Sequence, residues 1–235
     1  DLMFLDGFVQ PLFDLVINKP EPLFERVIEV DERIDADGNP LRSPELKPVR
    51  VALAEALTAG IESVAICLLH SFANSSHEEQ VEGVAREAGF REISRSSRLS
   101  PLIKIVSRTD TTLVDAYLNP ILRQYVDRLR ESLGTSSLKI MTSAGGLVDA
   151  DRFVGKDNIL SGPAGGVIGF SRVAERAGFQ RSIGFDMGGT STDVSRYDGS
   201  YEREFETTKA GVRIVSPMLA IETVAAATQR LRSLQ

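Results

Sequence analysis

The period of apolar and polar positions changes several times along the first half of the chain. Residues 24–34 alternate apolar with charged positions, which indicates a half-buried strand, and Asp37-Gly38 predicts the turn that follows it. Residues 49–59 carry apolar side chains at helical spacing, 61–69 form the apolar run of a buried strand, and 77–89 show helical spacing again and end on glycine. This succession of helices and strands predicts an α/β fold.

The second half continues the alternation. Residues 109–133 have the longest helical pattern, and Pro120 inside it predicts a kink or two helices that meet there. Residues 138–148 predict a strand, a glycine-rich turn and another strand. Residues 158–178 begin as a strand and enter a helix, and 181–199 predict a β-hairpin.

Composition limits the classes of function. The 235 residues are 42% hydrophobic and 26% charged, which is ordinary for a globular protein, and the net charge is −6. The basic residues are scattered among acids, which argues against a broad nucleic-acid surface. No apolar run reaches the roughly 18 residues of a membrane span. Cys67, the sole cysteine, is interpreted as a small buried hydrophobe, and we expect a cytoplasmic location.

Other polar features are interpreted as structural. His77 opens the helical segment 77–89, where a solvent-facing position is expected, and neither it nor His70 has a partner at metal-ligand spacing. A polar cluster lies at the start of the long helix, and helix capping explains it more simply than substrate contact. Its members are Arg108, Thr109, Asp110, Thr111 and Thr112.

The hairpin segment contains FDMGGTSTDVS, whose acids, hydroxyls and adjacent glycines are poor core residues. Gly188 and Gly189 allow a tight turn with positive φ, and their uncovered backbone N–H groups can point at phosphate oxygens. Hydroxyl donors follow at Thr190, Ser191 and Thr192. Asp186 and Asp193 suit a hydrated Mg²⁺, which takes one or two carboxylates. The alternative is an ordinary hairpin whose polar residues face water, but the convergence of so many polar groups favours a phosphate site.

A second glycine-rich turn, LSGPAGGV, occupies 160–167. Ser161 is a suitable N-cap, and Pro163 suits the first turn of a helix. Small residues then leave the backbone exposed at a helix N-terminus, where anions are favoured. They are Gly162, Gly165 and Gly166. Phosphate contact and close helix–strand packing both account for them. A third small-residue turn, TSAGGL at 142–147, could contact a ligand, but a plain turn is favoured.

The run SGPAGGVIG, followed by IGFDMGGTSTDVSRYDGSYEREFETTKAGVRIVSPML, resembles the hydantoinase/5-oxoprolinase family, specifically its hydantoinase A-type ATP-binding half. Upstream, KPEPLFERVIEVDERI, CLLHSFANSSHEEQ and RTDTTLVDAYLNPILRQYVDRL look like the family's segments in the same order. Turn-prone residues and Pro101 ahead of the long helix predict a domain boundary near residue 107. Residues 1–107 look like the C-terminal part of the family's N-terminal region, and 108–235 like the N-terminal part of its ATP-binding domain.

The resemblance implies a nucleotide-binding fold of the actin/hexokinase/Hsp70 (ASKHA, ribonuclease H-like) type, in which two related domains close over a nucleotide. It also implies ATP-dependent hydrolysis of a cyclic amide, either 5-oxoproline or a hydantoin, with ATP and Mg²⁺ as cofactors. Asp186 would be the catalytic residue, by binding Mg²⁺ through water or by orienting a nucleophile. A hydantoinase B-type partner subunit or domain and an oligomeric intact enzyme are expected.

The sequence also departs from the family pattern. Family members have a further Asp-x-Gly-Gly-Thr hairpin and a Gly-Gly-Gly-Ser turn that this sequence lacks, and Ala220 and Glu222 stand where they have Asp and His. We therefore expect a fold truncated at both ends and a chain that is inactive alone. Two alternatives are a non-catalytic fragment or assembly module with weak or no nucleotide binding, and an ATP-driven conformational switch.

Overall fold

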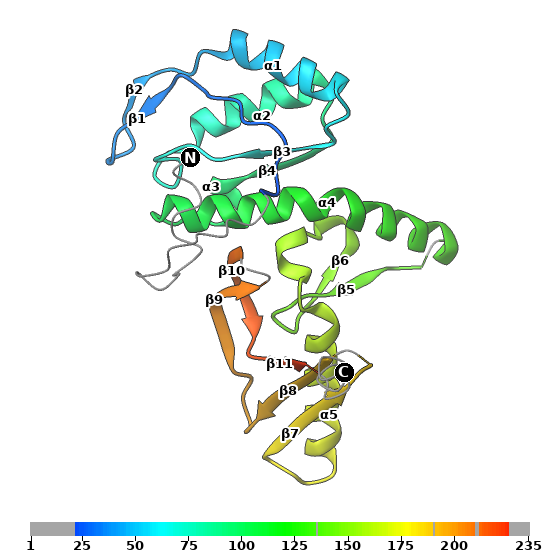
Figure 1. Cartoon of the computed structure of the whole chain (residues 1–235). Coiled ribbons are helices and arrows are strands. Elements are labelled where there is room, and N and C mark those ends of the chain that lie inside the picture. Colours follow the sequence, from blue (N-terminus) through cyan, green and yellow to red (C-terminus); the bar gives the residue numbers. More distant parts are fainter. Residues whose placement is uncertain (1–21, 135, 190, 210–211, 226–235) are drawn as a thin grey trace, which may run out of the picture. The chain divides into compact units, whose positions relative to one another are not determined.

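The computed structural model describes residues 22–134, 136–189, 191–209 and 212–225. They belong to two compact units, of which the first comprises Asp1–Ser132 with Glu206–Val215 and the second Leu133–Phe205 with Ser216–Gln235. Each unit combines helices with strands (Figure 1), which confirms the α/β expectation. The domain boundary near residue 107 and the actin-type fold stay predictions.

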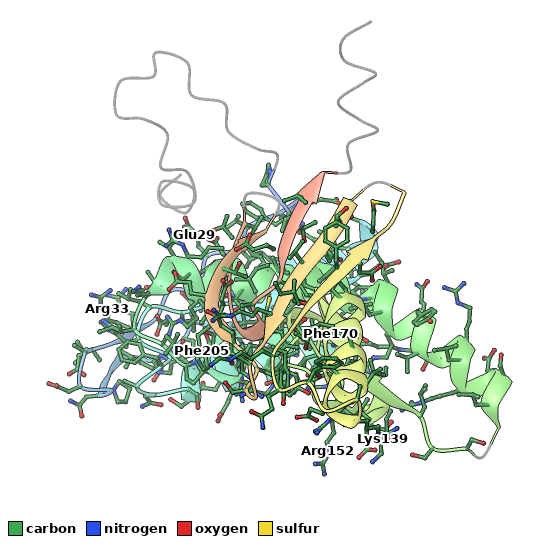
Figure 2. All side chains as sticks on the ribbon, turned by 90° about the horizontal axis from the view of Figure 1, so that it is seen from below. Glu29, Arg33, Lys139, Arg152, Phe170 and Phe205 are labelled. Atoms are coloured by element: carbon green, nitrogen blue, oxygen red, sulfur yellow. The ribbon has the colours of Figure 1, made fainter. Side chains whose placement is uncertain are left out.

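Helices and short strands alternate along the first unit. The strands are β1 (Arg33–Ile34), β2 (Pro40–Arg42), β3 (Ser63–Ile66) and β4 (Glu92–Arg95). The helices are α1 (Leu46–Thr58), α2 (Ser76–Ala88), α3 (Ser96–Leu99) and α4 (Ile105–Leu133). β3 and β4 pair in parallel, whereas β1 and β2 pair antiparallel, with Arg33 (Figure 2) opposite Arg42. Gly38, in the predicted turn between β1 and β2, has a φ of +88°.

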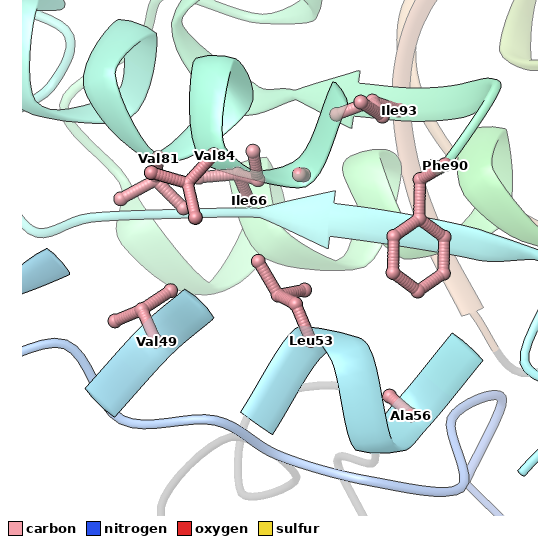
Figure 3. Packing of buried hydrophobic residues seen from close by; sticks show 9 residues of the cluster. Val49, Leu53, Ala56, Ile66, Val81, Val84, Phe90 and Ile93 are labelled. Carbon is pink, nitrogen blue, oxygen red and sulfur yellow. The ribbon is translucent and has the colours of Figure 1, made fainter. Parts of the chain in front are cut away.

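The core of the first unit lies where α1 and α2 meet the strand pair (Figure 3). Val49, Leu53 and Ala56 are about one turn apart on α1 and are buried. The other members of the cluster are Ile66, Val81, Val84, Ala85, Phe90 and Ile93. Gly89 ends α2 in the left-handed region, with φ +112°, as the glycine at this position predicted.

The strand predicted over residues 24–34 is reduced to its last two residues. Ile28 and Val30 do pack against the core cluster, so the apolar side of the alternation is buried as expected. Among the described residues, however, no strand pairs with 24–32. An alternating segment becomes a strand only where a neighbour completes the hydrogen-bond ladder, and β2 does so only for Arg33–Ile34.

His77 is buried, and the expectation that it faces solvent is wrong. It is the second residue of α2 and only 2% of its surface is exposed. Its Nδ1 lies 2.6 Å from Oε2 of Glu32, whose side chain is also buried. The acid that covers His77 comes from the segment before β1, and the local pattern of α2 contains no sign of it.

The polar cluster at 108–112 does not cap α4, because the helix already begins at Ile105. Arg108 is fully buried, and its Nη2 donates to the carbonyl oxygens of Leu68 and Leu69 over 2.7 and 2.8 Å. Thr111 is also fully buried. Its hydroxyl accepts a hydrogen bond from the N–H of Val215 over 2.9 Å, whereas the hydroxyl of Thr112 donates within α4 to the carbonyl of Arg108 over 2.7 Å. The capping interpretation is therefore wrong.

α4 continues as one helix through Pro120. The alternative of two helices that meet there is therefore wrong. A proline removes one backbone N–H from the helical ladder, and the bonds of the neighbouring turns hold this long helix together. Across the described ranges, α4 included, no helix is both long and apolar enough to cross a membrane.

The second unit also alternates strands and helices. Its strands are β5 (Lys139–Met141), β6 (Leu147–Asp149), β7 (Ser182–Met187), β8 (Ser191–Tyr197) and β11 (Glu222–Ala225). Its helices are α5 (Ser161–Arg176) and two 3₁₀ turns, Ala150–Arg152 and Gly155–Asn158. β9 (Arg203–Lys209) and β10 (Val212–Leu219) pair with each other, and each contributes residues to both units.

Two of the three predictions for the second unit are confirmed. β5 and β6 form the predicted strand–turn–strand, and β7 and β8 form the predicted hairpin, to which β11 adds a third antiparallel strand. The strand expected before α5 is wrong. The 3₁₀ turn Gly155–Asn158 stands there instead, where the N–H of Asp157 bonds to the carbonyl of Val154 over 3.2 Å.

Candidate functional site

The hairpin of β7 and β8 places two carboxylates opposite each other. Asp186 is the register partner of Asp193, and Asp193 is in turn the partner of Thr223 on β11. Directly opposed residues of antiparallel strands share one face of a sheet, so these side chains form a polar row. Oγ1 of Thr223 donates a hydrogen bond to Oδ1 of Asp193 over 2.8 Å, which orients that carboxylate.

Helix α5 lies against the face that carries this row. Gly184 and Asp186 are two residues apart on β7 and therefore point to the same side. The ring of Phe170 on α5 (Figure 2) fills the space over Gly184, where an added Cβ would come within 2.2 Å of it. A Cβ added to Gly166 on the same helix would lie 3.9 Å from Oδ2 of Asp186. The glycine-rich start of α5 is therefore next to the first carboxylate.

The start of α5 is held by a residue that the sequence analysis did not single out. The N-cap is Leu160, and Ser161 is the first helical residue, so the predicted serine cap is wrong. The fully buried hydroxyl of Ser143 accepts a hydrogen bond from the N–H of Leu160 over 2.9 Å. The backbone of Ser143 also bonds to Asp157 and Leu219, over 2.6 and 2.8 Å. Ser143 thus anchors the N-cap from a neighbouring turn.

That neighbouring turn, at 142–147, is closed by its own backbone. The N–H of Thr142 donates to the carbonyl of Gly146 over 2.8 Å, and the N–H of Gly145 donates to the carbonyl of Thr142 over 2.9 Å. Gly145 has a φ of +81°, and a Cβ there would come within 3.0 Å of Ile168 on α5. The turn is therefore closed by its own backbone and packed against α5.

The glycine turn of the hairpin differs from the expected one. The N–H of Gly188 donates to the carbonyl of Ser191 over 2.9 Å. Neither Gly188 nor Gly189 has φ in the left-handed region, so the expectation of positive φ is wrong. The bond from Gly188 to Ser191 closes the turn without it. The amide of Gly188 is committed to this bond instead of pointing at an anion. Thr190 lies outside the described residues.

The alternation of β8 separates the predicted hydroxyls. Ser191 is two residues from Asp193 and shares its face of the sheet. Thr192 pairs with Met187, lies on the opposite face and is buried. The structure therefore brings Ser191 to the side of the carboxylates and places the side chain of Thr192 away from them.

The site combines an open helix start with two acids. A Cβ added to Gly162 or Gly165 would meet no atom within 4 Å, so the backbone there is open to a ligand. Helix N-termini favour anions, whereas the carboxylates of Asp186 and Asp193 repel them. A magnesium ion between the carboxylates and an anion would remove this repulsion, because it takes one or two carboxylates and completes its coordination shell with phosphate oxygens and water. Within the described residues, no group of three or more histidine, cysteine or acidic side chains could hold a metal by itself.

An ion pair between a buried lysine and a half-buried aspartate, just before α5, has no counterpart among the predicted site residues. Nζ of Lys156, which is 7% exposed, lies 2.5 Å from Oδ1 of Asp157. The hydroxyl of Ser216 on β10 donates to the same oxygen over 2.5 Å. Partners of this kind are what a buried charge requires. A Lys-Asp dipeptide outside any periodic segment indicates an exposed position, so the sequence carries no sign of this burial.

The far end of α5 is bonded to the hairpin sheet. The hydroxyl of Tyr197 on β8 donates to Oε1 of Glu175 on α5. This bond raises the pKa of Tyr197 and lowers the pKa of Glu175, and a hydrogen bond from Arg172 lowers the pKa of Glu175 further. Both shifts favour the neutral phenol and the ionised carboxylate, so the contact is formed at neutral pH.

Comparison with known proteins identifies the family. The sequence model of the hydantoinase/oxoprolinase family matches residues 108–233, and that of the hydantoinase/oxoprolinase N-terminal region matches residues 4–89. The chain is 42% identical to 5-oxoprolinase 1 of Arabidopsis thaliana over 96% of its own length, but over only 20% of that protein. The chain thus spans about a fifth of this curated relative.

Solved structures of two enzymes are also similar to the chain. One is the ATP-dependent caprolactamase of Pseudomonas jessenii, with a TM-score of 0.71 and 29% identity over 84% of this chain and 30% of that one. The other is nucleotide-free acetone carboxylase, an enzyme of ATP-dependent acetone carboxylation, with a TM-score of 0.69 and 26% identity over 84% of this chain and 29% of that one. The chain belongs to the hydantoinase/oxoprolinase family.

Proposed function

We propose that this chain supplies one phosphate-binding face of an enzyme that uses ATP to hydrolyse a cyclic amide. The observation that supports it most directly is that Asp186 lies opposite Asp193 and next to Gly166, in the glycine-rich start of α5. Membership of the hydantoinase/oxoprolinase family points to the same chemistry. The proposal includes an actin/Hsp70-type nucleotide-binding fold and a cytoplasmic location.

In this proposal the start of α5 binds the phosphates of ATP, and the β7–β8 hairpin holds the magnesium ion that accompanies them. The open backbone at Gly162 and Gly165 lies toward the phosphate oxygens, where the positive end of the helix dipole favours them. Asp186 and Asp193 hold Mg²⁺, and Thr223 orients the second of them. When bound, the ion neutralises negative charge on the phosphates.

The chemistry follows from the stability of amides. An amide resists hydrolysis because resonance stabilises its carbonyl and because nitrogen is a poor leaving group. Transfer of the γ-phosphoryl group to the amide oxygen forms an O–P bond, releases ADP and removes much of the resonance. Water then adds to the carbon, and the ring C–N bond breaks as the nitrogen takes a proton, which leaves an acyl phosphate. A second water hydrolyses this acyl phosphate to the carboxylate and free phosphate. The chain's part is to position the phosphates and to compensate their charge. Both 5-oxoproline and hydantoin contain such an amide.

Calorimetric titration of this chain with ATP in the presence of Mg²⁺ tests the site. We expect Asp186→Asn to weaken binding by about tenfold or more, because it removes a charge that the ion requires. The matched control is Asp198→Asn, which changes an exposed acid in the turn after β8 and should leave the affinity unchanged. Equal affinities of the wild type and Asp186→Asn would remove this acid from the site.

Phosphate release by an oxoprolinase-length polypeptide that contains this chain tests the reaction. We expect 5-oxoproline or hydantoin to stimulate it, and Asp186→Asn to abolish it while the fold is retained. A hydantoinase B-type partner should be added in parallel, since we propose that such a subunit or domain completes the substrate pocket. ATP binding without stimulation by either amide would instead favour a conformational switch, and the absence of ATP binding would favour a non-catalytic assembly module.

A further inference from the structure

Three segments of the second unit are hydrogen-bonded to one another in a closed ring beside the start of α5. The hydroxyl of Ser216 on β10 donates to Oδ1 of Asp157 over 2.5 Å. The carbonyl of Asp157 accepts from the N–H of Ser143 over 2.6 Å, and the carbonyl of Ser143 accepts from the N–H of Leu219 over 2.8 Å. The ring therefore leaves β10 at Ser216, passes through the 3₁₀ turn of Asp157 and the turn 142–147, and returns to β10 at Leu219.

Ser143 carries the contact between this ring and α5. Its hydroxyl accepts a hydrogen bond from the N–H of Leu160, the N-cap of α5, over 2.9 Å. The carbonyl of Leu160 in turn accepts from the N–H of Ala164 over 2.9 Å, which is the first bond of the helical ladder. Gly162 and Gly165, whose backbone is open to a ligand, belong to the same stretch of helix. A shift of Ser143 would therefore move the backbone N–H groups that are proposed to meet the phosphates.

The ring also contains an ion pair. Nζ of Lys156 lies 2.5 Å from the carboxylate oxygen of Asp157 that Ser216 contacts, and 3.4 Å from Oγ of Ser216 itself. Removing charges from water costs about as much as their attraction returns, so such a pair adds little to stability. Lys156 does, however, cancel a negative charge three residues before the N-cap of a helix whose start favours anions.

We propose that Lys156, Asp157 and Ser216 are positioning residues for the phosphate-binding start of α5, and that they act through Ser143. Asp157 joins β10 to the turn of Ser143, and Lys156 keeps the carboxylate of Asp157 from repelling the phosphates. This inference rests on the proposed function, because it assigns the three residues to the ATP site described above. A ring that is closed before ATP arrives spares the cost of ordering the helix start on binding, which raises affinity.

Hydrogen–deuterium exchange of the chain without nucleotide tests whether the ring holds α5. Ser216→Ala opens the ring at Asp157, and we expect the amides of Leu160 and Ala164 to exchange about fivefold faster or more. The matched control is Ser171→Ala, which also removes a fully buried hydroxyl of the second unit but one that has no bond in the ring. It should leave the exchange of both amides unchanged.

Calorimetric titration with ATP and Mg²⁺ tests whether this anchoring matters for the ligand. Ser216→Ala should weaken binding by about fivefold or more, because the helix start must then be ordered as ATP binds. Ser171→Ala should bind as the wild type does. Circular dichroism verifies that both variants are fully folded at the temperature of the titration, so a general loss of stability would not separate them.

A third variant tests the charge of the ring and does not depend on the folding of Ser216→Ala. Lys156→Met leaves the carboxylate of Asp157 uncompensated, and we expect it to weaken the binding of ATP by about tenfold. The double variant Lys156→Met, Asp157→Asn removes both charges and keeps a side-chain oxygen for Ser216. It should recover most of the lost affinity, which a merely structural role of Lys156 would not predict.

Several results would overturn the inference. They are unchanged exchange of Leu160 and Ala164 in Ser216→Ala, equal losses of affinity in Ser216→Ala and Ser171→Ala, and a double variant that binds no better than Lys156→Met. Failure of the proposed function has a different signature, because the wild type itself would then not bind ATP. Binding that Asp186→Asn weakens but that Ser216→Ala and Lys156→Met leave unchanged would keep the proposed function and remove only the positioning residues.

Discussion

The ring of Phe170 on α5 occupies the space where any side chain of Gly184 on β7 would stand. A Cβ at position 184 would come within 2.2 Å of this ring, which is closer than real Cβ contacts. The contact sets how closely α5 approaches β7, and with it the position of Gly166 beside Asp186. The glycine in the middle of a strand is thus required by packing rather than by its backbone conformation.

This relationship predicts the effect of adding one methyl group. Gly184→Ala should lower the free energy of unfolding by about 1–3 kcal/mol, because the ring or the helix must move. Urea unfolding monitored by circular dichroism measures it. The double variant Gly184→Ala, Phe170→Leu should recover part of the loss. Gly169→Ala on the same helix, where a Cβ would meet nothing within 4 Å, should be neutral or stabilising. Equal losses at both glycines would contradict the role of the ring.

Ser143 anchors the N-cap of α5 from another turn. Ser143→Ala should destabilise the chain by about 1–2 kcal/mol, because the N–H of Leu160 loses its hydroxyl partner in a buried place. The change should be measured by chemical denaturation against Ser200→Ala, which removes an exposed hydroxyl. If the two variants unfold at the same denaturant concentration, Ser143 does not hold the helix start.

The bond between Tyr197 and Glu175 predicts sensitivity to both acid and alkali. Because the pKa of Glu175 is lowered in the folded chain, its stabilising effect is present above the usual carboxyl range and is lost as pH falls through the lowered value. Because the pKa of Tyr197 is raised, the corresponding effect is present below its ordinary value and is lost as pH rises through the raised value. Thermal melts between pH 3 and 11 measure both limits.

Two variants isolate this bond. Glu175→Gln should flatten the acid limb of the melting profile, and Tyr197→Phe should flatten the alkaline limb, because each removes the group that titrates. Profiles that keep the wild-type shape in both variants would show that other groups control the pH dependence.

Cys67 should be a slow nucleophile. Burial raises the pKa of its thiol, and the opposing hydrogen bond with Thr109 has the smaller effect. We therefore expect alkylation by iodoacetamide at pH 8 to be about tenfold slower or more than in the urea-unfolded chain, because the thiolate is the reactive form. The rate should rise as pH passes the ordinary thiol range. Cys67 is half-buried in the structure, and equal rates in the folded and unfolded chain would show that this burial does not protect its thiol.

The spacing of apolar residues and glycines was sufficient to predict the elements that depend only on residues close together in the sequence. Apolar residues at helical spacing predicted α1 and α2, and the glycine pair between two apolar segments predicted the β7–β8 hairpin. Strand alternation also implies that Asp186 and Asp193 share a face, because opposed positions of a hairpin do so. These features depend on residues that are close in sequence.

The sequence by itself therefore determined the α/β class, the hairpin and the family, since each is expressed in short-range order. Only the tertiary structure decided that Glu32 covers His77, that Ser143 holds the start of α5, and that 24–32 lacks a strand partner. The physical reason is that burial, ion pairing and strand pairing depend on contacts between segments far apart in the chain. A local pattern indicates which side of a helix or strand is apolar, but it does not indicate which distant residue will pack against that side.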